Sequence, residues 1–414
     1  MYVSKGEVNL KLLLITHDFP FGNAETFLET EIKYATQAFK KVYIISASKN
    51  KAKTRNVPEG VIVYKVGREY KKAKCIIKSI CRIFSNELFQ EIKIKSKHYS
   101  IITIIKQCLI FYIIEERLRQ FVLNNELYGD DYIAYSYWLA EGSYFISKNR
   151  SLWHKSISRV HSYEVWKETY IPFICNTIVN LDKVFAISLD TKKMMINMLS
   201  SYGISKKYNC TLSRLGVLVS KSEVHKKQSK NYISIVSCSN IYKLKRLDLI
   251  IDIISELSNF TFVEWVHFGG GIDECEIKKY AQRSLSSKSV KWSITGWIDN
   301  EKVIEYYKKN QVDLFINMSD KEGIPVSIME AISFGIPCLA RDVGGIREIV
   351  INEESGYLVK QDVRVEECIH KICQYIKKDI KYKNNIYKKV KNIYEKYYDA
   401  EINYRTFYKI IFNL

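Results

Sequence analysis

Two glutamates in the stretch SDKEGIPVSIMEAISFGIP, residues 319–337, have the type and spacing of a ligand site. Glu322 follows the apolar run VDLFINM, and seven residues separate it from Glu330, which lies in an amphipathic pattern. Ligands of doubly wound sheets bind beyond the carboxyl ends of the strands, where Glu322 is expected. Pro325 suits the first turn of a helix, whose free N–H groups would receive a diphosphate. Glu330 would then accept hydrogen bonds from a ribose, and Glu322 would meet the far end of the ligand. The alternative is a capping acid followed by a solvated helix acid.

Further candidates stand at loop positions. KLKRLDLI places Lys245 and Arg246 where a loop opens a helix, and a cation there would neutralise a departing phosphate. An exposed first-turn lysine is the alternative. Trp297 in TGWID either borders a base or belongs to the core. His161 in SRVHSYE ends a strand, as an acid, base or hydrogen-bonding group, or as a structural histidine. Gly22 lies in the Gly/Asn turn FPFGNAETF.

The composition limits the class of protein. The 414 residues suit two domains, and 47% apolar with 26% charged residues is a globular composition. The net charge of +19 favours anionic partners, unless it reflects only a solvated basic surface. Ten cysteines without a CxxC pair indicate reduced core thiols, and the spacing of Cys368, His370 and Cys373 matches no zinc site.

The sequence shows no secretory signal and no apolar stretch of about 18 residues, the length of a membrane span. We therefore expect a cytoplasmic protein, soluble or peripheral at the inner face of the plasma membrane. The basic, tyrosine-rich tail from Asp379 is expected to be a helix. Its helical stripe favours a core-facing surface over a nucleic-acid groove. The stripe consists of Tyr382, Ile386, Val390 and Ile393.

Apolar runs alternate with amphipathic stretches, which predicts parallel sheets in an α/β fold. In the second half the expected strands are 232–239, 261–271, 290–297, 312–319 and 337–343, and the expected helices are 244–257, 273–285, 300–310 and 325–335. In the first half the expected strands are 10–16, 41–47, 131–138, 156–162 and 182–188, with a helix at 25–39 and a long basic helical region from about Tyr70 to Leu123. A polar connector at 219–231 would join two Rossmann-like halves.

In this order the motifs resemble the retaining glycosyltransferases of family 4, which have the two-domain GT-B fold. EGIPVSIME matches the E-x7-E motif of that family, AISFGIPCLARDVGGIREIV matches its continuation, and KLKRLDLII resembles the segment with its phosphate-binding lysine. FPFGNAETFLETEI, SYWLAEG, SRVHSYE and SRLGV resemble first-domain features of a subgroup that builds bacterial surface polysaccharides. The resemblance implies two Rossmann-like doubly wound domains facing an interdomain cleft. Residues 1–218, joined by the C-terminal helix 398–414, would bind the acceptor, and residues 231–397 the donor.

The resemblance implies transfer of a sugar from a nucleotide diphosphate sugar with retained anomeric configuration, without a metal or other cofactor. Glu322 would orient the donor sugar, Lys245 would stabilise the leaving diphosphate, and His161 would sit near the transferred sugar. The implied donor-binding residues are Glu330, Gly323, Ile324, Ser327, Asn240, Arg246, Trp297 and Gly22.

Two positions depart from the family pattern. Asn240 stands where the family often has an arginine, so Arg246 or another cation would contact the phosphate instead. Pro325 replaces a glycine of many members, which removes one N–H donor.

The expected acceptor is a glycan, carried on a polyprenyl diphosphate. Basic helices would rest on an anionic membrane surface through Lys71, Lys72, Lys74, Lys78, Arg82, Lys93, Lys95 and Lys97. One alternative is a nucleotide-sugar epimerase of GT-B-like fold, which would need no acceptor. A basic nucleic-acid-binding protein is the other, and it would explain the charge but not the paired glutamates. Nucleic acid is not an expected partner.

Overall fold

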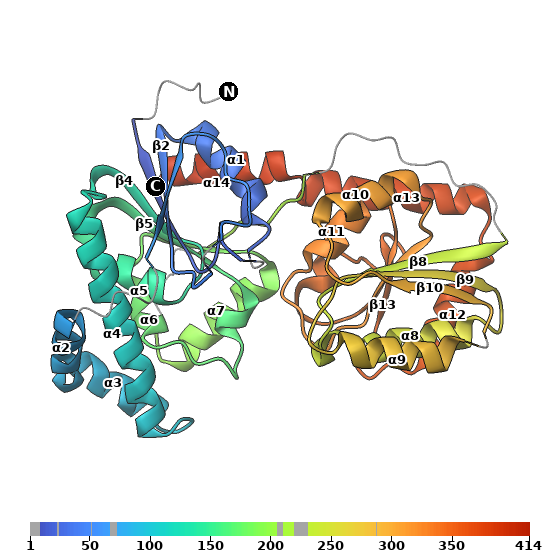
Figure 1. Cartoon of the computed structure of the whole chain (residues 1–414), viewed down its shortest axis with the longest axis horizontal. Helices are drawn as coiled ribbons and strands as arrows, with labels where there is room; N and C mark the ends of the chain where they lie inside the picture. The colour runs from blue at the N-terminus through green and yellow to red at the C-terminus, as the bar shows by residue number, and fades with distance from the viewer. Residues whose placement is uncertain are drawn as a thin grey trace. The chain divides into compact units, whose positions relative to one another are not determined.

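The computed structural model describes residues 9–22, 25–50, 52–66, 73–204, 210–218, 231–286 and 288–414. The chain forms two compact units (Figure 1): unit 1 is Met1–Leu215 with Ala400–Leu414, and unit 2 is Gly216–Asp399. Unit 1 contains a sheet of seven strands and unit 2 a sheet of six. The predicted α/β fold with two parallel sheets is confirmed. Of the expected connector, residues 219–230 lie outside the described ranges.

The sheet of unit 1 has the order β3-β2-β1-β4-β5-β6-β7. Its strands are β1 (Lys11–Thr16), β2 (Lys41–Ser46), β3 (Val61–Lys65), β4 (Gly129–Ser136), β5 (Trp153–Val160), β6 (Lys183–Ala186) and β7 (Cys210–Leu212). Its helices are α1 (Leu28–Ala38), α2 (Ala73–Cys81), α3 (Asn86–Lys95), α4 (Ile101–Asn124), α5 (Glu141–Lys148), α6 (Ile174–Asn180), α7 (Leu189–Ser201) and α14 (Ala400–Phe412). The sequence did not predict β3 and β7. Both are partly buried edge strands, which lack the apolar run of a central strand.

Helices cover both faces of the unit 1 sheet. Successive side chains of a strand point to opposite faces. Leu12 and Leu14 of β1 pack in the cluster formed with α1 and α14, whereas Leu13 and Ile15 pack in the cluster formed with α4, α5, α6 and α7. Burial on both faces explains why β1 reads as the uninterrupted apolar run KLLLIT.

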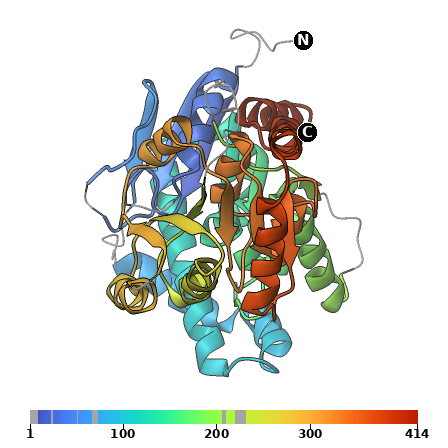
Figure 2. The same cartoon turned by 90° about the vertical axis from the view of Figure 1, so that its right-hand side faces the viewer.

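The sheet of unit 2 has the order β10-β9-β8-β11-β12-β13. Its strands are β8 (Tyr232–Cys238), β9 (Phe262–Phe268), β10 (Val290–Ile294), β11 (Leu314–Asn317), β12 (Cys338–Arg341) and β13 (Gly356–Val359). Its helices are α8 (Leu247–Leu257), α9 (Glu274–Leu285), α10 (Asn300–Lys309), α11 (Val326–Ser333), α12 (Val365–Ile376) and α13 (Ile380–Tyr397). Helices α8, α9 and α12 lie on one face of the sheet and α10, α11 and α13 on the other (Figures 1 and 2).

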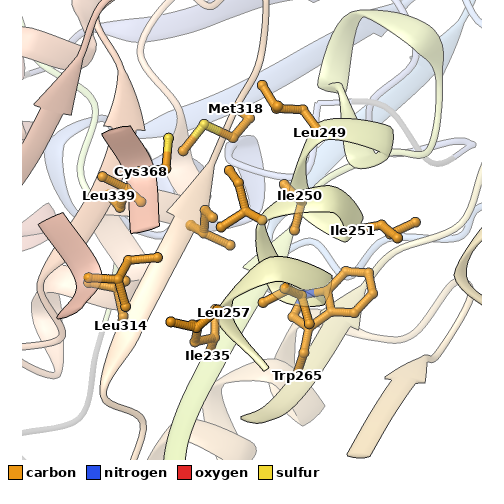
Figure 3. Close-up of a cluster of buried hydrophobic side chains, with 14 of the residues drawn as sticks. Ile235, Leu249, Ile250, Ile251, Leu257, Trp265, Leu314, Met318, Leu339 and Cys368 are labelled. Atoms are coloured by element: carbon orange, nitrogen blue, oxygen red, sulfur yellow. The ribbon is translucent and has the colours of Figure 1, made fainter. Parts of the chain in front are cut away.

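One apolar cluster ties α8 to the unit 2 sheet (Figure 3). It contains Ile250 and Leu257 of α8, Trp265 of β9 and Leu314 of β11, all nearly inaccessible to solvent. Helix α13 buries Ile386, Val390 and Ile393, so three of the four residues predicted to face the core do so, and Tyr382 is partly exposed.

The basic helical region predicted from about Tyr70 to Leu123 forms α2, the 3₁₀ turn η1 (Arg82–Phe84), α3 and α4. Two of its cations were wrongly assigned to an outer surface. Arg82 bonds Glu115 at 2.8 Å and the hydroxyl of Tyr144 at 2.7 Å, and Lys95 is 8% exposed with its amine on the hydroxyl of Tyr202. Lys95 is therefore held inside, and Arg82, which is 28% exposed, is engaged by a carboxylate and a phenol. Lys71, Lys72 and the side chain of Lys74 lie outside the described residues.

All ten cysteines are free, and Cys81 and Cys275 are exposed, so the prediction of core thiols is wrong for these two. In the described ranges, no three or more His, Cys, Asp or Glu residues cluster as metal ligands would. Within the same ranges, every helix falls short of the length and apolar content that a bilayer span requires.

A buried ion pair joins the elements of unit 1. Arg159 of β5 and Glu31 of α1 are 0% and 1% exposed and lie 3.2 Å apart. The guanidinium also donates to the hydroxyl of Tyr135 at 2.8 Å and to the carbonyl of Ser213 at 2.9 Å, and it lies over the ring of Phe407 in α14. The C-terminal helix is thereby fixed to unit 1 through a charge that has no contact with water.

Replacing Arg159 with Met is expected to lower the free energy of unfolding of unit 1 by about 3–5 kcal/mol, because it leaves Glu31 charged and buried. The double substitution Arg159→Met with Glu31→Gln should recover part of the loss, since no buried charge is left uncompensated. Urea unfolding followed by circular dichroism measures both effects. Arg405→Ala is the control, since it breaks the exposed pair with Glu401 and should cost about 1 kcal/mol or less. Equal losses in the Arg159 single and Arg405 variants would contradict the role of the pair.

Candidate active site

The candidate site of unit 2 lies at the point where the strand order reverses. β8 is the first strand of this sheet in the chain, and it is flanked by β9 on one side and β11 on the other. Loops that leave adjacent strands in opposite directions open a crevice at such a switch point. The loop after β8 carries Lys245 in the 3₁₀ turn η4 (Lys243–Lys245), and the loop after β11 carries Glu322.

Lys245 and Glu322 form an ion pair across this point. The Lys245 Nζ lies 2.6 Å from Glu322 Oε1, and the two side chains are 15% and 10% exposed. Ser319 Oγ donates to the same carboxylate oxygen at 2.7 Å, and Asn317 Nδ2 lies 3.4 Å from it. These donors all meet Oε1, and within the described ranges none bonds the other oxygen, Oε2, which can accept a hydrogen bond from a ligand. The alternatives of a capping acid and an exposed lysine do not fit this pairing.

Asp320 holds the two loops together. Its N–H donates to the carbonyl of Leu244 at 2.8 Å, next to Lys245. Its carboxylate accepts from buried Arg341 of β12, and Arg246 NH1 lies 3.4 Å away. Arg246 also bonds Asp248, at 2.9 Å. The guanidinium proposed to replace the missing arginine at Asn240 therefore already has two carboxylate partners, while Asn240 itself is exposed.

The glycines after β12 allow the Glu322 loop to pack closely. Gly344 has a φ of +53°, and a Cβ there would collide with the carbonyl oxygen of Glu322. The next N–H, of Gly345, donates to the carbonyl of Gly323 at 2.7 Å. This part of the sequence motif thus fixes the backbone beside the ion pair.

Helix α11 begins at Val326, so Pro325 is its N-cap. The sequence had predicted Pro325 in the first turn of the helix. The carbonyl of Pro325 accepts from the N–H of Ile328 at 3.1 Å. The first N–H groups of any helix have no carbonyl partner within it, and here these belong to Val326 and Ser327. Together with the preceding Gly323 and Ile324, they are the first backbone donors that follow Glu322 in the sequence.

Glu330 is buried within α11. Its side chain is 8% exposed, and Oε1 accepts a hydrogen bond from Asn300 Nδ2 at 2.7 Å. Burial raises the pKa of this carboxyl to about 7, and the bond from Asn300 offsets part of that rise. A solvated helix acid, the alternative considered from the sequence, is therefore wrong. Sequence reasoning missed Asn300, because thirty residues separate it from Glu330 and no local spacing links them.

Trp297 lies at the same edge, after β10, and is 60% exposed, so it is not a core residue. A Cβ on Gly270 would come within 2.7 Å of its indole. The glycine-rich turn after β9 also packs on the loop after β8, where a Cβ on Gly271 would collide with the backbone of Ile241. The edge of unit 2 thus brings together a nearly complete set of the predicted donor-binding residues, and it leaves an aromatic ring accessible beside a backbone turn.

Unit 1 contains His161 and Gly22. His161 follows β5 and is 7% exposed, yet neither ring nitrogen has a hydrogen-bond partner among the described residues. Its ring centroid lies 4.2 Å from that of Trp138 and 5.0 Å from that of Tyr137, and Nδ1 lies 3.5 Å from Glu164. Buried polar atoms are normally paired, so an unpaired imidazole is typical of a group that meets a ligand.

Glu25 orders the first loop of unit 1 and was not found from the sequence. Its carboxylate is 4% exposed and accepts from the N–H groups of His17, Asp18 and Phe19 at 3.1, 2.7 and 2.5 Å. It also accepts from the indole of Trp138, the ring that packs against His161. Glu25 lies within the motif FPFGNAETFLETEI, but its contact with Trp138 joins residues 113 positions apart, which no local spacing indicates.

Gly22 lies in the same loop with a φ of +68°, where a Cβ would collide with the side chain of Asn50. Its carbonyl accepts a hydrogen bond from Thr54. The structure therefore places Gly22 and His161 in unit 1 and the other predicted site residues in unit 2.

Solved structures share this architecture over nearly the whole chain. The lipopolysaccharide outer core galactosyltransferase WaaB superposes with a TM-score of 0.69 at 16% identity, covering 98% of this chain and 99% of that one. The Anabaena protein HepE, solved in complex with UDP and glucose, gives 0.64 at 14% identity, covering 98% and 100%. The chain has the GT-B fold.

Sequence comparisons match part of the chain to glycosyltransferases. Residues 220–392 match the family described as glycosyl transferases group 1. An O-antigen biosynthesis glycosyltransferase of Escherichia coli, WbnH, is 32% identical over 116 residues, or 28% of this chain and 30% of that protein. A lipopolysaccharide 1,6-galactosyltransferase of Salmonella typhimurium is 25% identical over 239 residues, or 57% and 63%. These matches span less than two thirds of the relatives, and they support a GT-B glycosyltransferase.

Replacing Glu330 with Gln is expected to stabilise the ligand-free protein at pH 8. The pKa of the carboxyl is 4.5 in the unfolded chain and about 7 when folded, so the cost of burying its charge grows between these pH values and is complete above pH 7. The difference between the two pKa values corresponds to a gain in the free energy of unfolding of at most about 3 kcal/mol. Thermal unfolding at pH 5 and pH 8 should show the gain mainly at the higher pH. Glu301→Gln, at an exposed position of α10, is the control. A lower stability of the Glu330 variant at pH 8 would contradict the interpretation.

Proposed function

We propose that this protein is a retaining glycosyltransferase that moves a sugar from a nucleotide diphosphate sugar to a hydroxyl group of a glycan acceptor. The single observation that carries the proposal is the Lys245–Glu322 ion pair, 2.6 Å long, at the switch point of the unit 2 sheet. The match of residues 220–392 to glycosyl transferases group 1 supports it, as does the complex of HepE with UDP and glucose.

In the ligand-free protein, Lys245 and Glu322 neutralise each other. A bound diphosphate carries more negative charge than one carboxylate, so it competes for the lysine. We propose that Lys245 turns to the diphosphate, together with the N–H groups that lead into α11. Glu322 keeps Ser319 as a donor and accepts from a sugar hydroxyl through Oε2. Glu330 accepts from the ribose and Trp297 borders the base.

The reaction breaks the bond between the anomeric carbon and the diphosphate oxygen. The acceptor oxygen bonds to the same face of that carbon, and the acceptor proton passes to an oxygen of the departing diphosphate. Negative charge builds up on the diphosphate during this step, and Lys245 and the helix N–H groups stabilise it. We propose that no metal ion takes part. Arg246 already has carboxylate partners, so Lys245 is the proposed main cation for the phosphate.

His161 is the proposed catalytic residue of unit 1, because neither nitrogen of its buried imidazole has a hydrogen-bond partner among the described residues, and Glu164 lies 3.5 Å from Nδ1. Gly22 lies in the loop that Glu25 orders, and we propose that it lies close to the donor phosphate or the acceptor. Relatives in Escherichia coli and Salmonella typhimurium are named for O-antigen biosynthesis and lipopolysaccharide galactosyl transfer. On that basis we propose an acceptor carried on a lipid, such as a polyprenyl diphosphate, in the synthesis of a cell-surface polysaccharide.

A panel of nucleoside diphosphates and nucleotide sugars, tested by thermal shift, gives the first test of the donor site. A ligand at about 100 times its dissociation constant should stabilise the protein by about 2.7 kcal/mol. Lys245→Ala should remove most of the shift, because the diphosphate loses its cation. Lys243→Ala is the matched control, since it removes an exposed lysine from the same turn and should keep the shift. The absence of any nucleotide-dependent shift in the native protein would overturn the proposal.

Transfer itself should depend on residues of both units. Glu322→Ala and His161→Ala are each expected to lower kcat/KM by about 10²–10³, because each removes a group that meets the transferred sugar. The assay follows acceptor-dependent release of the nucleoside diphosphate, in excess EDTA, where activity should persist. Circular dichroism checks that the variants are folded. Full activity in both variants would contradict the assignment. Conversion of the sugar nucleotide in the absence of an acceptor would favour the epimerase.

A further inference from the structure

The helices α2, α3 and the first half of α4, with the turn η1 between them, gather at one end of unit 1 (Figure 1). Their outward surface is unusually apolar. Phe84 is 91% exposed, Phe89 65% and Ile102 80%. We call this surface the α2–α4 face, and its exposed large apolar residues are Ile77, Ile80, Phe84, Phe89, Ile94, Ile101, Ile102 and Ile110.

These residues are not needed for the core of the helical region. Leu88, Ile104 and Cys108 are buried in a cluster of their own with Tyr144 of α5. In α4, Ile102 and Ile110 are exposed while Ile104 and Cys108 are buried. One face of the helix therefore packs on the core, and the opposite face presents apolar residues to solvent. A single exposed apolar residue needs no explanation, but eight lie within 34 residues of chain, and apolar residues gathered on a surface mark an interaction site.

The charges on the α2–α4 face have one sign. Lys93, Lys97 and Lys106 are exposed among the apolar residues, and Lys78 is exposed but pairs with Glu116 of α4 at 3.0 Å. From residue 73 to residue 110 the sequence contains two acids, Glu87 and Glu91. Glu91 is buried, and Glu87 is 15% exposed and bonds the hydroxyl of Tyr144 at 3.0 Å, within 3.5 Å of Arg82 and Lys148. The outward surface is therefore apolar and cationic, without an exposed carboxylate.

We propose that the α2–α4 face docks on an anionic bilayer surface. Phe84, Phe89 and Ile102 enter the headgroup region, and the lysines approach lipid phosphates. The apolar residues of this face match the apolar interior of a bilayer, and its lysines match anionic lipid headgroups. A second copy of the chain would bring the same lysines together, which is repulsive. A nucleic acid would match the lysines but leave the phenylalanines in contact with a polar backbone. The proposal does not rest on glycosyl transfer, because it concerns only this surface.

Flotation of the full chain with lipid vesicles tests the proposal. Vesicles of phosphatidylcholine mixed with phosphatidylglycerol should carry the protein upward, and vesicles of phosphatidylcholine alone should carry little. High salt should strip the protein from the anionic vesicles, because the lysines contribute through screened charge. Firm retention in high salt, or no flotation with anionic vesicles, would overturn the proposal.

Two sets of variants test which residues bind. Phe84→Ser with Phe89→Ser should weaken vesicle binding by about tenfold or more, because apolar area no longer enters the interface. Phe260→Ser is the matched control, as Phe260 is 67% exposed in unit 2, and it should bind as the native protein does. Lys93→Gln, Lys97→Gln and Lys106→Gln together should weaken binding by about 100-fold.

The nucleotide-dependent thermal shift should stay unchanged in all these variants, which separates this proposal from that of the donor site. Unchanged vesicle binding by the double phenylalanine variant would show that another surface docks. A concentration-dependent dimer of the native protein in sedimentation, lost in that variant, would assign the face to a second copy of the chain and overturn the proposal.

Discussion

The ion pair between Lys245 and Glu322 is the constraint on which the rest of unit 2 depends. The two residues are 77 positions apart in the chain, and only the neighbouring positions of β8 and β11 bring their loops together. The carboxylate of Asp320 is shared by Arg246 and Arg341 and holds the two loops together. Gly344 allows a close backbone contact with Glu322 that a side chain would block. A partly buried pair of this kind is stable while its charges remain matched. A more negative ligand can therefore take the lysine without leaving an unpaired cation.

Both units contain a buried polar group whose placement is costly without a ligand. Burial raises the pKa of Glu330 to about 7 although Asn300 bonds it, and neither ring nitrogen of His161 has a hydrogen-bond partner among the described residues. Proteins break the rules of polar satisfaction mainly where function requires it. By contrast, the buried pair of Arg159 and Glu31 has a full set of partners, and its role is to hold α14 on unit 1.

Sequence reasoning succeeded where a property is local. Strands buried on both faces read as apolar runs, so the central strands of both sheets were predicted, while the partly buried edge strand β3 was not. The spacing of Glu322 and Glu330 marked one helix start. Asn300, Glu25 and Asp320 were missed because at least one partner of each lies on another element. Arg82 and Lys95 were misplaced because a charge in the sequence does not say which face of a helix carries it, and the exposure of Phe84 and Phe89 could be learned only from the structure.

The most direct measurement is a crystal structure with the nucleoside diphosphate that the thermal-shift panel selects. The account predicts that Lys245 Nζ bonds a phosphate oxygen, that it has left Glu322 Oε1, and that the ribose hydroxyls lie within hydrogen-bond distance of Glu330. A diphosphate bound elsewhere, with the Lys245–Glu322 pair still at 2.6 Å, would contradict the account.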